Sequence, residues 1–163
     1  MVRSWDKEVG HIHDSALEGR KPLLETVKRA AHMEAGFIRK KCVIAVLWDA
    51  EKFFDSLDIP TLVSRAVDLG FPPEVMILGL QIHRAPRVMK ALDSLTGPLP
   101  RTGRSIMAGC TLSTSFARAY IHTIISVMPN IPGQLNYQHV DDVDLITQSG
   151  KVDKAVKRTI RGA

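Results

Sequence analysis

Hydrophobic residues recur at helical spacing in several stretches of the chain. The first begins at Pro22, a favourable first helical residue, and runs to Gly36, which predicts a helix over residues 22–35. The same spacing and the capping residues around it predict four more helices, from Asp58 to Gly70, from Pro73 to the residue before Pro86, over about residues 113–127 with Pro129 as its stop, and from Val152 to Arg161. Residues 1–21 show no sustained period and predict an irregular or partly helical lead-in.

Three other stretches favour strands. Cys42–Trp48 is an apolar, partly β-branched run bounded by charged residues, which predicts a buried strand with Asp49 at its end. Residues 134–140 and 143–148 predict the two antiparallel strands of a hairpin, with the pair Asp141-Asp142 at its bend. Helices and antiparallel strands in this order predict an α+β fold in one domain, with the sheet packed against helices.

The segment between the third and fourth predicted helices is rich in turn-forming residues. Residues 95–103 contain four glycines or prolines in close succession, and they interrupt two short predicted strands over residues 87–92 and 104–107.

Composition places the chain among ordinary globular proteins. It has 163 residues, of which 45% are hydrophobic, and a net charge of +5 that is compatible with a polyanionic partner. Its two cysteines, Cys42 and Cys110, form no disulfide or zinc-binding pattern. The longest apolar run falls far short of a membrane span, and the N-terminal residues lack the apolar core of a signal peptide. We therefore expect an intracellular, non-secreted protein without a membrane partner.

Aspartates carry the candidate chemistry. If the strand before Asp49 pairs with the predicted hairpin, then Asp49, Asp141 and Asp142 meet at one edge of a sheet. Carboxylate oxygens from several aspartates suit a pair of divalent cations, which activate an attacking hydroxyl and stabilise a leaving oxygen. Spacing alone also allows the ordinary alternative, in which Asp49 caps a loop and the other two form a turn.

Three motifs in order resemble the palm of reverse transcriptases. They are Leu47–Leu57, with an aspartate at Asp49 and an aromatic residue five positions later; Gly109–Ser113, which leads into a helix; and His139–Asp142. Their combination in order is more specific than any one of them. The resemblance covers residues 42–148 and is to retroelement reverse transcriptases of the type without long terminal repeats.

The resemblance implies an RNA-directed DNA polymerase. Asp49, Asp141 and Asp142 would be the catalytic residues and would bind two Mg²⁺ ions, with Mn²⁺ as an alternative. The partners implied are an RNA template, a DNA primer and a deoxynucleoside triphosphate. The primer 3′-OH would attack the α-phosphate of the nucleotide, with pyrophosphate as the leaving group.

Four further positions are implied as substrate-binding residues. They are Ala50, through its carbonyl oxygen, and Phe54, Gly109 and Ser113. Phe54 would lie beneath the sugar and exclude a ribose 2′-OH, the group that separates RNA from DNA precursors. Gly109 would let the backbone approach the nascent base pair. From the residues alone, Phe54 is better interpreted as a core aromatic beside Phe53, and Gly109 is equally well interpreted as a turn glycine.

The chain also departs from the family pattern. Ala108 stands where glutamine is common, Thr114 where proline is usual, and His139 where an aromatic residue usually opens the last motif. The resemblance implies a divergent and truncated reverse transcriptase domain over residues 1–163. Within it, residues 1–41 are a partial lead-in on the fingers side, 42–148 the palm core and 149–163 a C-terminal helix.

Two other functions share these residues. A catalytically inactive remnant of a retroelement would bind nucleic acid without a metal or a nucleotide. An RNA-templated RNA polymerase palm would use the same acids, although Phe54 argues against it.

The remaining polar clusters carry weaker predictions. Arg39, Lys40 and Lys41 are candidates for holding the incoming triphosphate, but a cluster of this kind is commonly a solvated edge. The final helix is basic, which fits either phosphate contacts or solvent. The set His11, His13 and Asp14 lacks a fourth metal ligand at suitable spacing.

Overall fold

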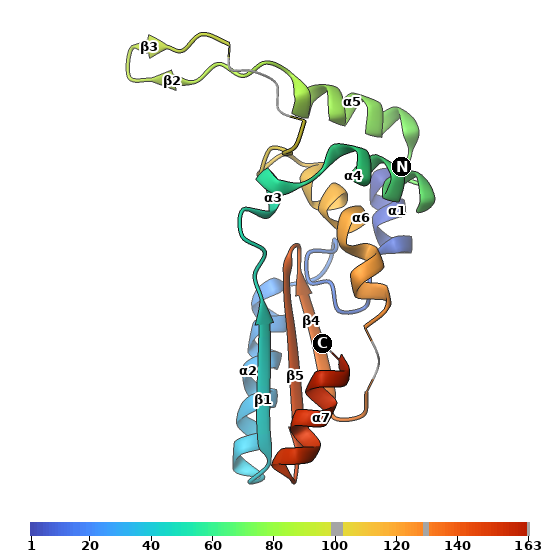
Figure 1. Ribbon diagram of the computed structural model, residues 1–163, viewed down its shortest axis with the longest axis vertical. Coiled ribbons are helices and arrows are strands. Elements are labelled where there is room, and N and C mark those ends of the chain that lie inside the picture. The colour runs from blue at the N-terminus through green and yellow to red at the C-terminus, as the bar shows by residue number, and fades with distance from the viewer. Residues whose placement is uncertain (99–102, 129–130, 163) are drawn as a thin grey trace. The chain divides into compact units, whose positions relative to one another are not determined.

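The computed structural model describes residues 1–98, 103–128 and 131–162, with Ala91 described by its backbone only. The chain forms two compact units (Figure 1). Unit 1 comprises Met1–Trp5 and Lys52–Tyr120, and unit 2 comprises Asp6–Glu51 and Ile121–Ala163. The single domain with boundaries at residues 41 and 148 stays a prediction.

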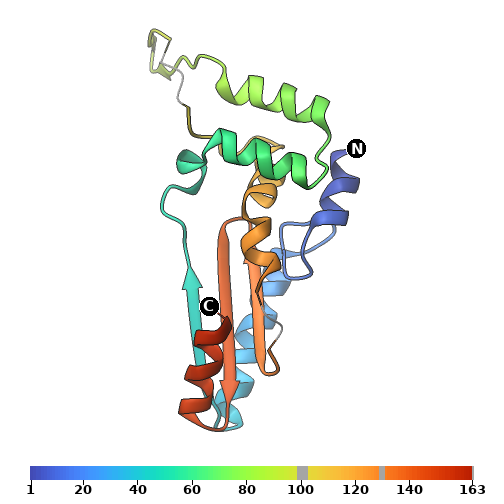
Figure 2. The same cartoon turned by 45° about the vertical axis from the view of Figure 1, so that its right-hand side comes forward.

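Unit 2 is built on a three-stranded antiparallel sheet with the strand order β1-β5-β4. The strands are β1 (Cys42–Trp48), β4 (Gln134–His139) and β5 (Asp142–Ser149). Helices α2 (Pro22–Ile38) and α7 (Val152–Gly162) lie on opposite faces of this sheet (Figures 1 and 2). The central strand β5 supplies the core, because Leu145 and Ile146 are at most 1% exposed. The α+β prediction is therefore confirmed, with an antiparallel sheet packed against helices.

Helix α2 continues past the glycine at which the sequence predicts its end. Gly36 is buried, and a Cβ at this position would lie 2.5 Å from Val43 Cγ2 and 2.9 Å from Gln148 Nε2. The absence of a side chain thus lets α2 approach the sheet closely. The predicted helix end at residue 35 is wrong, because this glycine serves helix–sheet packing and not termination.

The hairpin between β4 and β5 has a two-residue turn. His139 pairs with Asp142, so the turn consists of Val140 and Asp141. The predicted bend at Asp141-Asp142 is therefore displaced by one residue, and Asp142 is the first residue of β5. Val140 has a φ of +56°, a left-handed conformation that costs a side chain with a Cβ roughly 1–2 kcal/mol. A tight turn that places a β-branched residue there is strained.

Unit 1 contains most of the remaining helices. They are α3 (Phe53–Ser56), α4 (Ile59–Asp68), α5 (Pro73–Arg84) and the larger part of α6 (Ser113–Ser126), and the N-terminal helix α1 (Val2–Val9) begins in this unit. Its core is aromatic: the Trp5 and Phe71 ring centroids are 4.7 Å apart, and those of Phe71 and Phe116 are 5.5 Å apart. The helices predicted from Asp58, Pro73 and residue 113 are confirmed to within two residues.

The short strands predicted in unit 1 differ from those found. β2 (Lys90–Ala91) and β3 (Ser94–Leu95) pair with each other, so the strand predicted over residues 87–92 is reduced to its last part. No strand forms over residues 104–107, where Arg104 makes only an isolated bridge with Asp58. The predicted helix stop at Pro129 and residues 99–102 of the turn-rich segment lie outside the described residues.

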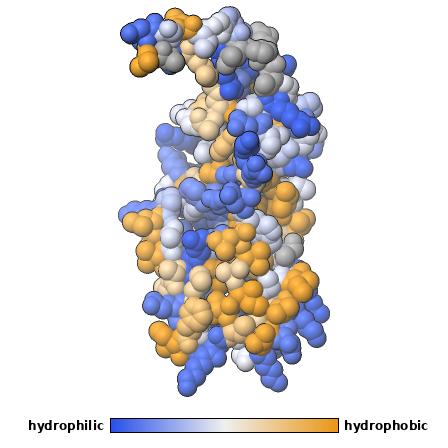
Figure 3. Space-filling model, turned by 60° about the vertical axis from the view of Figure 1, so that its left-hand side comes forward, coloured by the Kyte–Doolittle hydropathy of each residue, from blue (hydrophilic) through white to orange (hydrophobic). Residues whose placement is uncertain are grey.

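The surface of unit 2 carries many apolar side chains. Figure 3 shows them gathered on the part of the molecule that holds the three-stranded sheet. On α2, Leu23, Phe37 and Ile38 are exposed, and on β1 Leu47 is exposed as well. Within the described ranges, no helix combines the length and the apolar character needed to cross a membrane.

Candidate functional site

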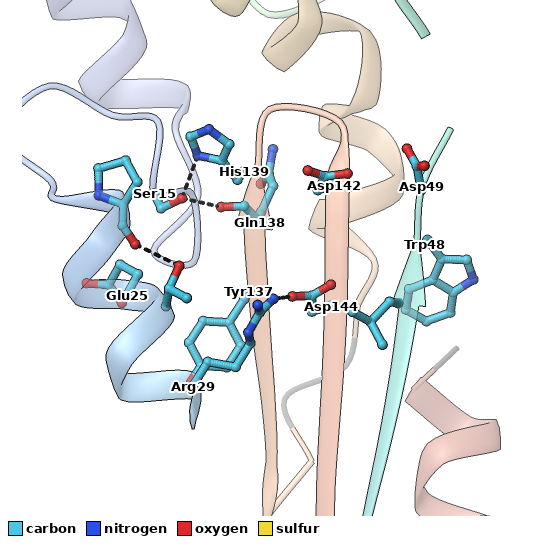
Figure 4. A pocket seen from close by; sticks show the side chains of 13 residues that line it. Ser15, Glu25, Arg29, Trp48, Asp49, Tyr137, Gln138, His139, Asp142 and Asp144 are labelled. Carbon is cyan, nitrogen blue, oxygen red and sulfur yellow. Dashed lines mark hydrogen bonds and ion pairs between the residues drawn. The ribbon is translucent and has the colours of Figure 1, made fainter. Parts of the chain in front are cut away.

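The pairing of the strands brings the aspartates of the first and third motifs to one end of the sheet in unit 2. β1 pairs with β5 up to Trp48, which lies opposite Val143. One further step along this register sets Asp49 beside Asp142. On the other side of β5, His139 pairs with Asp142. Figure 4 shows Asp49, Asp142 and His139 at this end of the three strands, and Asp141 precedes Asp142 in the turn.

The charges of these carboxylates act on one another. Partial burial raises the pKa of Asp141 above its ordinary value, and the negative charges of Asp142 and Asp49 raise it further. A backbone hydrogen bond and the nearby His139 act in the opposite direction. Asp49 and Asp142 are exposed, and Asp141 is partly buried. Such an arrangement concentrates negative charge at the tip of the hairpin, which a cation would relieve.

The carboxylate groups at this end of the sheet are of the type that binds a hard divalent cation. Carboxylate oxygens are the ligands that Mg²⁺ prefers, and two of the three acids are open to solvent. In residues 1–98, 103–128 and 131–162, however, no three His, Cys, Asp or Glu side chains are grouped closely enough to hold one ion. This finding includes His11, His13 and Asp14. Side-chain rotation of the acids toward a shared ion is therefore needed for them to bind it together.

A cavity of about 420 Å³ lies beside the acids, within unit 2 (Figure 4). Its lining comes from the start of α2, the end of β1, both strands of the hairpin and the loop at Ser15. The lining residues are Ser15, Pro22, Glu25, Thr26, Arg29, Leu47, Trp48, Asp49, Tyr137, Gln138, His139, Asp142 and Asp144. Of the predicted metal ligands, the cavity thus includes Asp49 and Asp142, while Asp141 lies outside its lining.

An ion pair between Arg29 and Asp144 crosses this cavity from α2 to β5 (Figure 4). Asp144 follows Asp142 by two residues, so both side chains project from the same face of the strand. The Asp144 side chain is 10% exposed and that of Arg29 is 34% exposed. The sequence prediction missed this pair. The available signal was an acidic residue inside an otherwise buried strand, which requires a partner.

Ser15 fixes the side chain that opens the third motif. The Ser15 hydroxyl donates to the Gln138 carbonyl over 2.9 Å, and its oxygen lies 2.9 Å from His139 Nδ1. Because a hydroxyl has one hydrogen, both contacts form together when Nδ1 of His139 carries the hydrogen. The ring is then held with Nε2 as its remaining acceptor.

Tyr137 adds a hydrogen-bond donor to the same cavity. Burial raises the pKa of its phenol, Glu25 raises it further and Arg29 lowers it. The phenol therefore keeps its proton at neutral pH.

The predicted substrate-binding residues fall in different units. Ala50 belongs to unit 2 and directly follows Asp49, whereas Phe54, Gly109 and Ser113 belong to unit 1. Phe54 is partly buried, and its neighbour Phe53 is the core aromatic.

The glycine loop of unit 1 is fastened to the start of α6 by the Ser113 side chain. Gly109 has a φ of +83°, and no atom lies within 4 Å of a Cβ built there. The backbone conformation therefore favours glycine at this position, although there is space for a side chain. Ser113 is buried, and its hydroxyl donates to the Met107 carbonyl, so it fastens the loop to the start of α6.

Arg39, Lys40 and Lys41 lie at the opposite end of β1 from the acids. They directly precede Cys42, the first residue of the strand, whereas Asp49 follows its last residue. A strand rises about 3.3 Å per residue, so roughly 26 Å separates Lys41 from Asp49. These candidates are therefore too far away to hold the phosphates of a nucleotide bound at the acids, and all three are exposed, as expected for a solvated edge.

Known proteins provide no further assignment. Comparisons of the chain with protein-family models, with curated proteins and with solved structures found no match.

Proposed function

We propose that this chain is the palm core of an RNA-directed DNA polymerase of the reverse transcriptase type, which transfers a deoxynucleotide to a primer 3′-OH. The observation that carries the proposal is the register of the sheet. The pairs Trp48–Val143 and His139–Asp142 bring Asp49 to the same end of the three strands as Asp142 and the turn residue Asp141, although Asp49 lies far from them in the sequence. Partial burial raises the pKa of Asp141, and the charges of Asp142 and Asp49 raise it further, which is the electrostatic consequence of this juxtaposition.

Each acid has a role in the proposed reaction. Asp49 and Asp142 line the cavity and would supply oxygen ligands from the ends of the neighbouring strands β1 and β5, and Asp141 would complete the set from the turn. When bound, Mg²⁺ would lower the pKa of the primer hydroxyl and neutralise charge on the phosphates. The Arg29–Asp144 pair keeps the next carboxylate on the strand neutralised by a cation of the protein. The negative charge available to a metal is thereby confined to the tip.

Single-nucleotide incorporation tests the proposal. The full chain is incubated with a primer–template duplex, a deoxynucleoside triphosphate and Mg²⁺, and primer extension is followed. Asp141→Asn should lower the rate about 100-fold or more, the scale of losing one group that stabilises transition-state charge. Asp68→Asn, an exposed acid on α4, is the matched control and should leave the rate unchanged. Equal rates in the wild type and Asp141→Asn would refute the metal role.

The sugar of the nucleotide separates the proposal from its rivals. With Phe54 beneath the sugar, the wild type should prefer deoxynucleotides, and Phe54→Ala should raise ribonucleotide incorporation relative to deoxynucleotide incorporation. A wild type that prefers ribonucleotides would indicate an RNA polymerase palm. Salt-dependent binding of nucleic acid that neither Mg²⁺ nor a nucleotide alters, without incorporation, would indicate an inactive remnant.

A further inference from the structure

A basic pocket lies at the end of the unit 2 sheet where β1 begins and β5 ends. Its volume is about 570 Å³, and it is lined by residues of four segments: α2 at His32, the turn from α2 into β1, the residues before β4, and the junction of β5 with α7. Five of the lining side chains are cationic, namely Arg39, Lys41, Lys151, Lys154 and Arg158, and none is a carboxylate.

From this pocket we infer a second ligand site in the protein, which binds the phosphodiester backbone of a single-stranded nucleic acid without selecting its bases. It goes beyond the proposed catalytic function because it uses other residues at the other end of the strands. Asp142 and Ser149 begin and end β5, and seven residue steps of about 3.4 Å place them roughly 24 Å apart.

The charge of the pocket identifies the class of ligand. Within the described residues, none of the five cations forms an ion pair with a carboxylate, in contrast to Arg29 on the neighbouring helix. Asp153 belongs to the first turn of α7, but it does not line the pocket. A single phosphate group carries about two negative charges at most, so five cations exceed what one group requires. A chain of successive phosphates matches them better.

Two polar features add hydrogen-bond donors to these charges. The first backbone N–H groups of α7 have no partners within the helix and favour an anion near Lys151. His32 lines the pocket, and its Nε2 is buried without a hydrogen-bond partner among the described residues. Burial lowers the pKa of this histidine, and Lys41 and Arg39 lower it further, so the ring is neutral at pH 7. In the tautomer with the hydrogen on Nε2, a phosphate oxygen would accept from this N–H.

The pocket is also built, because its wall depends on a specific backbone approach. Arg158 Nη1 donates to the Gln148 carbonyl over 3.1 Å, and a Cβ at Gly133 would lie 2.9 Å from the same nitrogen. Gly133 has a φ of +81°, which favours glycine for a second reason. Arg158 is thus held in the wall by the sheet.

The lining explains why bases would not be selected and why a membrane is not the favoured partner. It contains no Phe, Tyr or Trp on which bases could stack. It also lacks large apolar side chains that could enter a lipid surface, since Pro132 is its most apolar member. Binding would therefore follow phosphate number and salt concentration.

The test measures binding of fluorescent 20-nucleotide single strands by anisotropy, with the full chain in EDTA and without nucleotide. Lys151→Gln/Lys154→Gln should weaken binding about tenfold or more at low salt and reduce the slope of log affinity against log salt by about 1.4, since each neutralised single-strand phosphate contributes about 0.7. Lys157→Gln/Arg161→Gln removes two charges from the same helix outside the pocket. The affinity of this control variant should fall by less than about twofold if direct contacts with the phosphates, and not the net charge of the protein, determine binding.

Several results would overturn the inference. The first two are an equal loss of oligonucleotide affinity in the two double variants and no loss of affinity in either. The others are an affinity that differs strongly between strands of dT and strands of mixed sequence, and binding of a 20-residue polyglutamate that is as tight as binding of the oligonucleotide. Binding of phosphatidylserine vesicles that depends on Lys151 and Lys154, with oligonucleotide binding unchanged, would assign the pocket to a membrane surface. Asp141→Asn should bind the oligonucleotide as tightly as the wild type does. Loss of primer extension and loss of binding at the pocket are therefore separate results, and either proposal can fail without the other.

Discussion

Removal of Arg29 is the most informative perturbation of the candidate site, because it leaves Asp144 without its cation. The carboxylate lies in the central strand with a side chain 10% exposed, and the Arg29 side chain is 34% exposed. Breaking a fully buried pair from one side costs about 3–5 kcal/mol, whereas an exposed pair contributes at most about 1 kcal/mol. With one partner a third exposed, we expect Arg29→Met to lower the free energy of unfolding by about 2–3 kcal/mol.

The neighbouring pair on α2 supplies a matched control. Lys28 and Glu25 are 2.8 Å apart, and the Lys28 side chain is 56% exposed. Lys28→Met removes the same charge from the same helix and should cost less than about 1 kcal/mol. Asp144→Asn should cost less than Arg29→Met, because the guanidinium left behind reaches solvent. In the double variant Arg29→Met/Asp144→Asn, the loss of unfolding free energy should be smaller than the sum of the two single losses, since no unpaired charge is left in the strand.

The two tryptophans allow the units to be followed separately during urea unfolding. Trp5 belongs to unit 1, and Trp48 belongs to unit 2 and lines the cavity. In a Trp5→Phe background, fluorescence therefore reports unit 2 alone. With a urea dependence of about 2 kcal/mol/M, the midpoint of Arg29→Met should fall by roughly 1–1.5 M. Equal midpoints for Arg29→Met and Lys28→Met would refute the view that this pair holds the site together.

Two further predictions concern single positions in unit 2. Gly133→Ala should lower the free energy of unfolding by about 1–3 kcal/mol, because the φ of Gly133 is +81° and Arg158 lies 2.9 Å from the new Cβ. Gly150→Ala is the control, since no atom lies within 4 Å of its new Cβ, and its free energy of unfolding in the same urea titration should stay within about 0.5 kcal/mol of the wild type. Burial and neighbouring acids raise the pKa of Asp141, so the folded state holds this proton more tightly and stability falls as pH rises through the folded pKa. Asp141→Asn should accordingly be more stable than the wild type at neutral pH without divalent ions, and thermal unfolding should show that advantage vanish below the ordinary aspartate pKa of about 3.9; an advantage that is the same at every pH would contradict this cause.

The positions of the strands and of most helices could be predicted from local pattern, but the predicted burial of β1 is wrong, because all of its residues are at least partly exposed. β1 follows the predicted Cys42–Trp48 run, and α4 begins after Asp58, whose carboxylate accepts from the Thr61 N–H as a helix cap should. Gly36 was misassigned because its role depends on Val43 and Gln148, which are remote in sequence. Residues 104–107 have strand-like composition but found no partner strand.

The acids of the site could be predicted, whereas the residues around them could not. Asp49 and Asp142 come together because the strand assignments were correct and antiparallel pairing then fixes their register. Arg29 and Ser15 lie on segments with no motif, and only the packing of α2 and of the N-terminal loop against the hairpin brings them in. The basic pocket was missed for the same reason, since its cations belong to separate segments that meet at the far end of the sheet.

Manganese binding tests the central claim most directly, because it needs neither primer nor template. Electron paramagnetic resonance reports free Mn²⁺ as the full chain is titrated. The wild type should bind the ion, Asp49→Asn/Asp142→Asn should bind it at least about tenfold more weakly because two of the ligands are lost, and Asp68→Asn should match the wild type. Mn²⁺ binding that is absent in the wild type, or equal in the wild type and the Asp49→Asn/Asp142→Asn variant, would contradict a divalent-metal site at the hairpin tip.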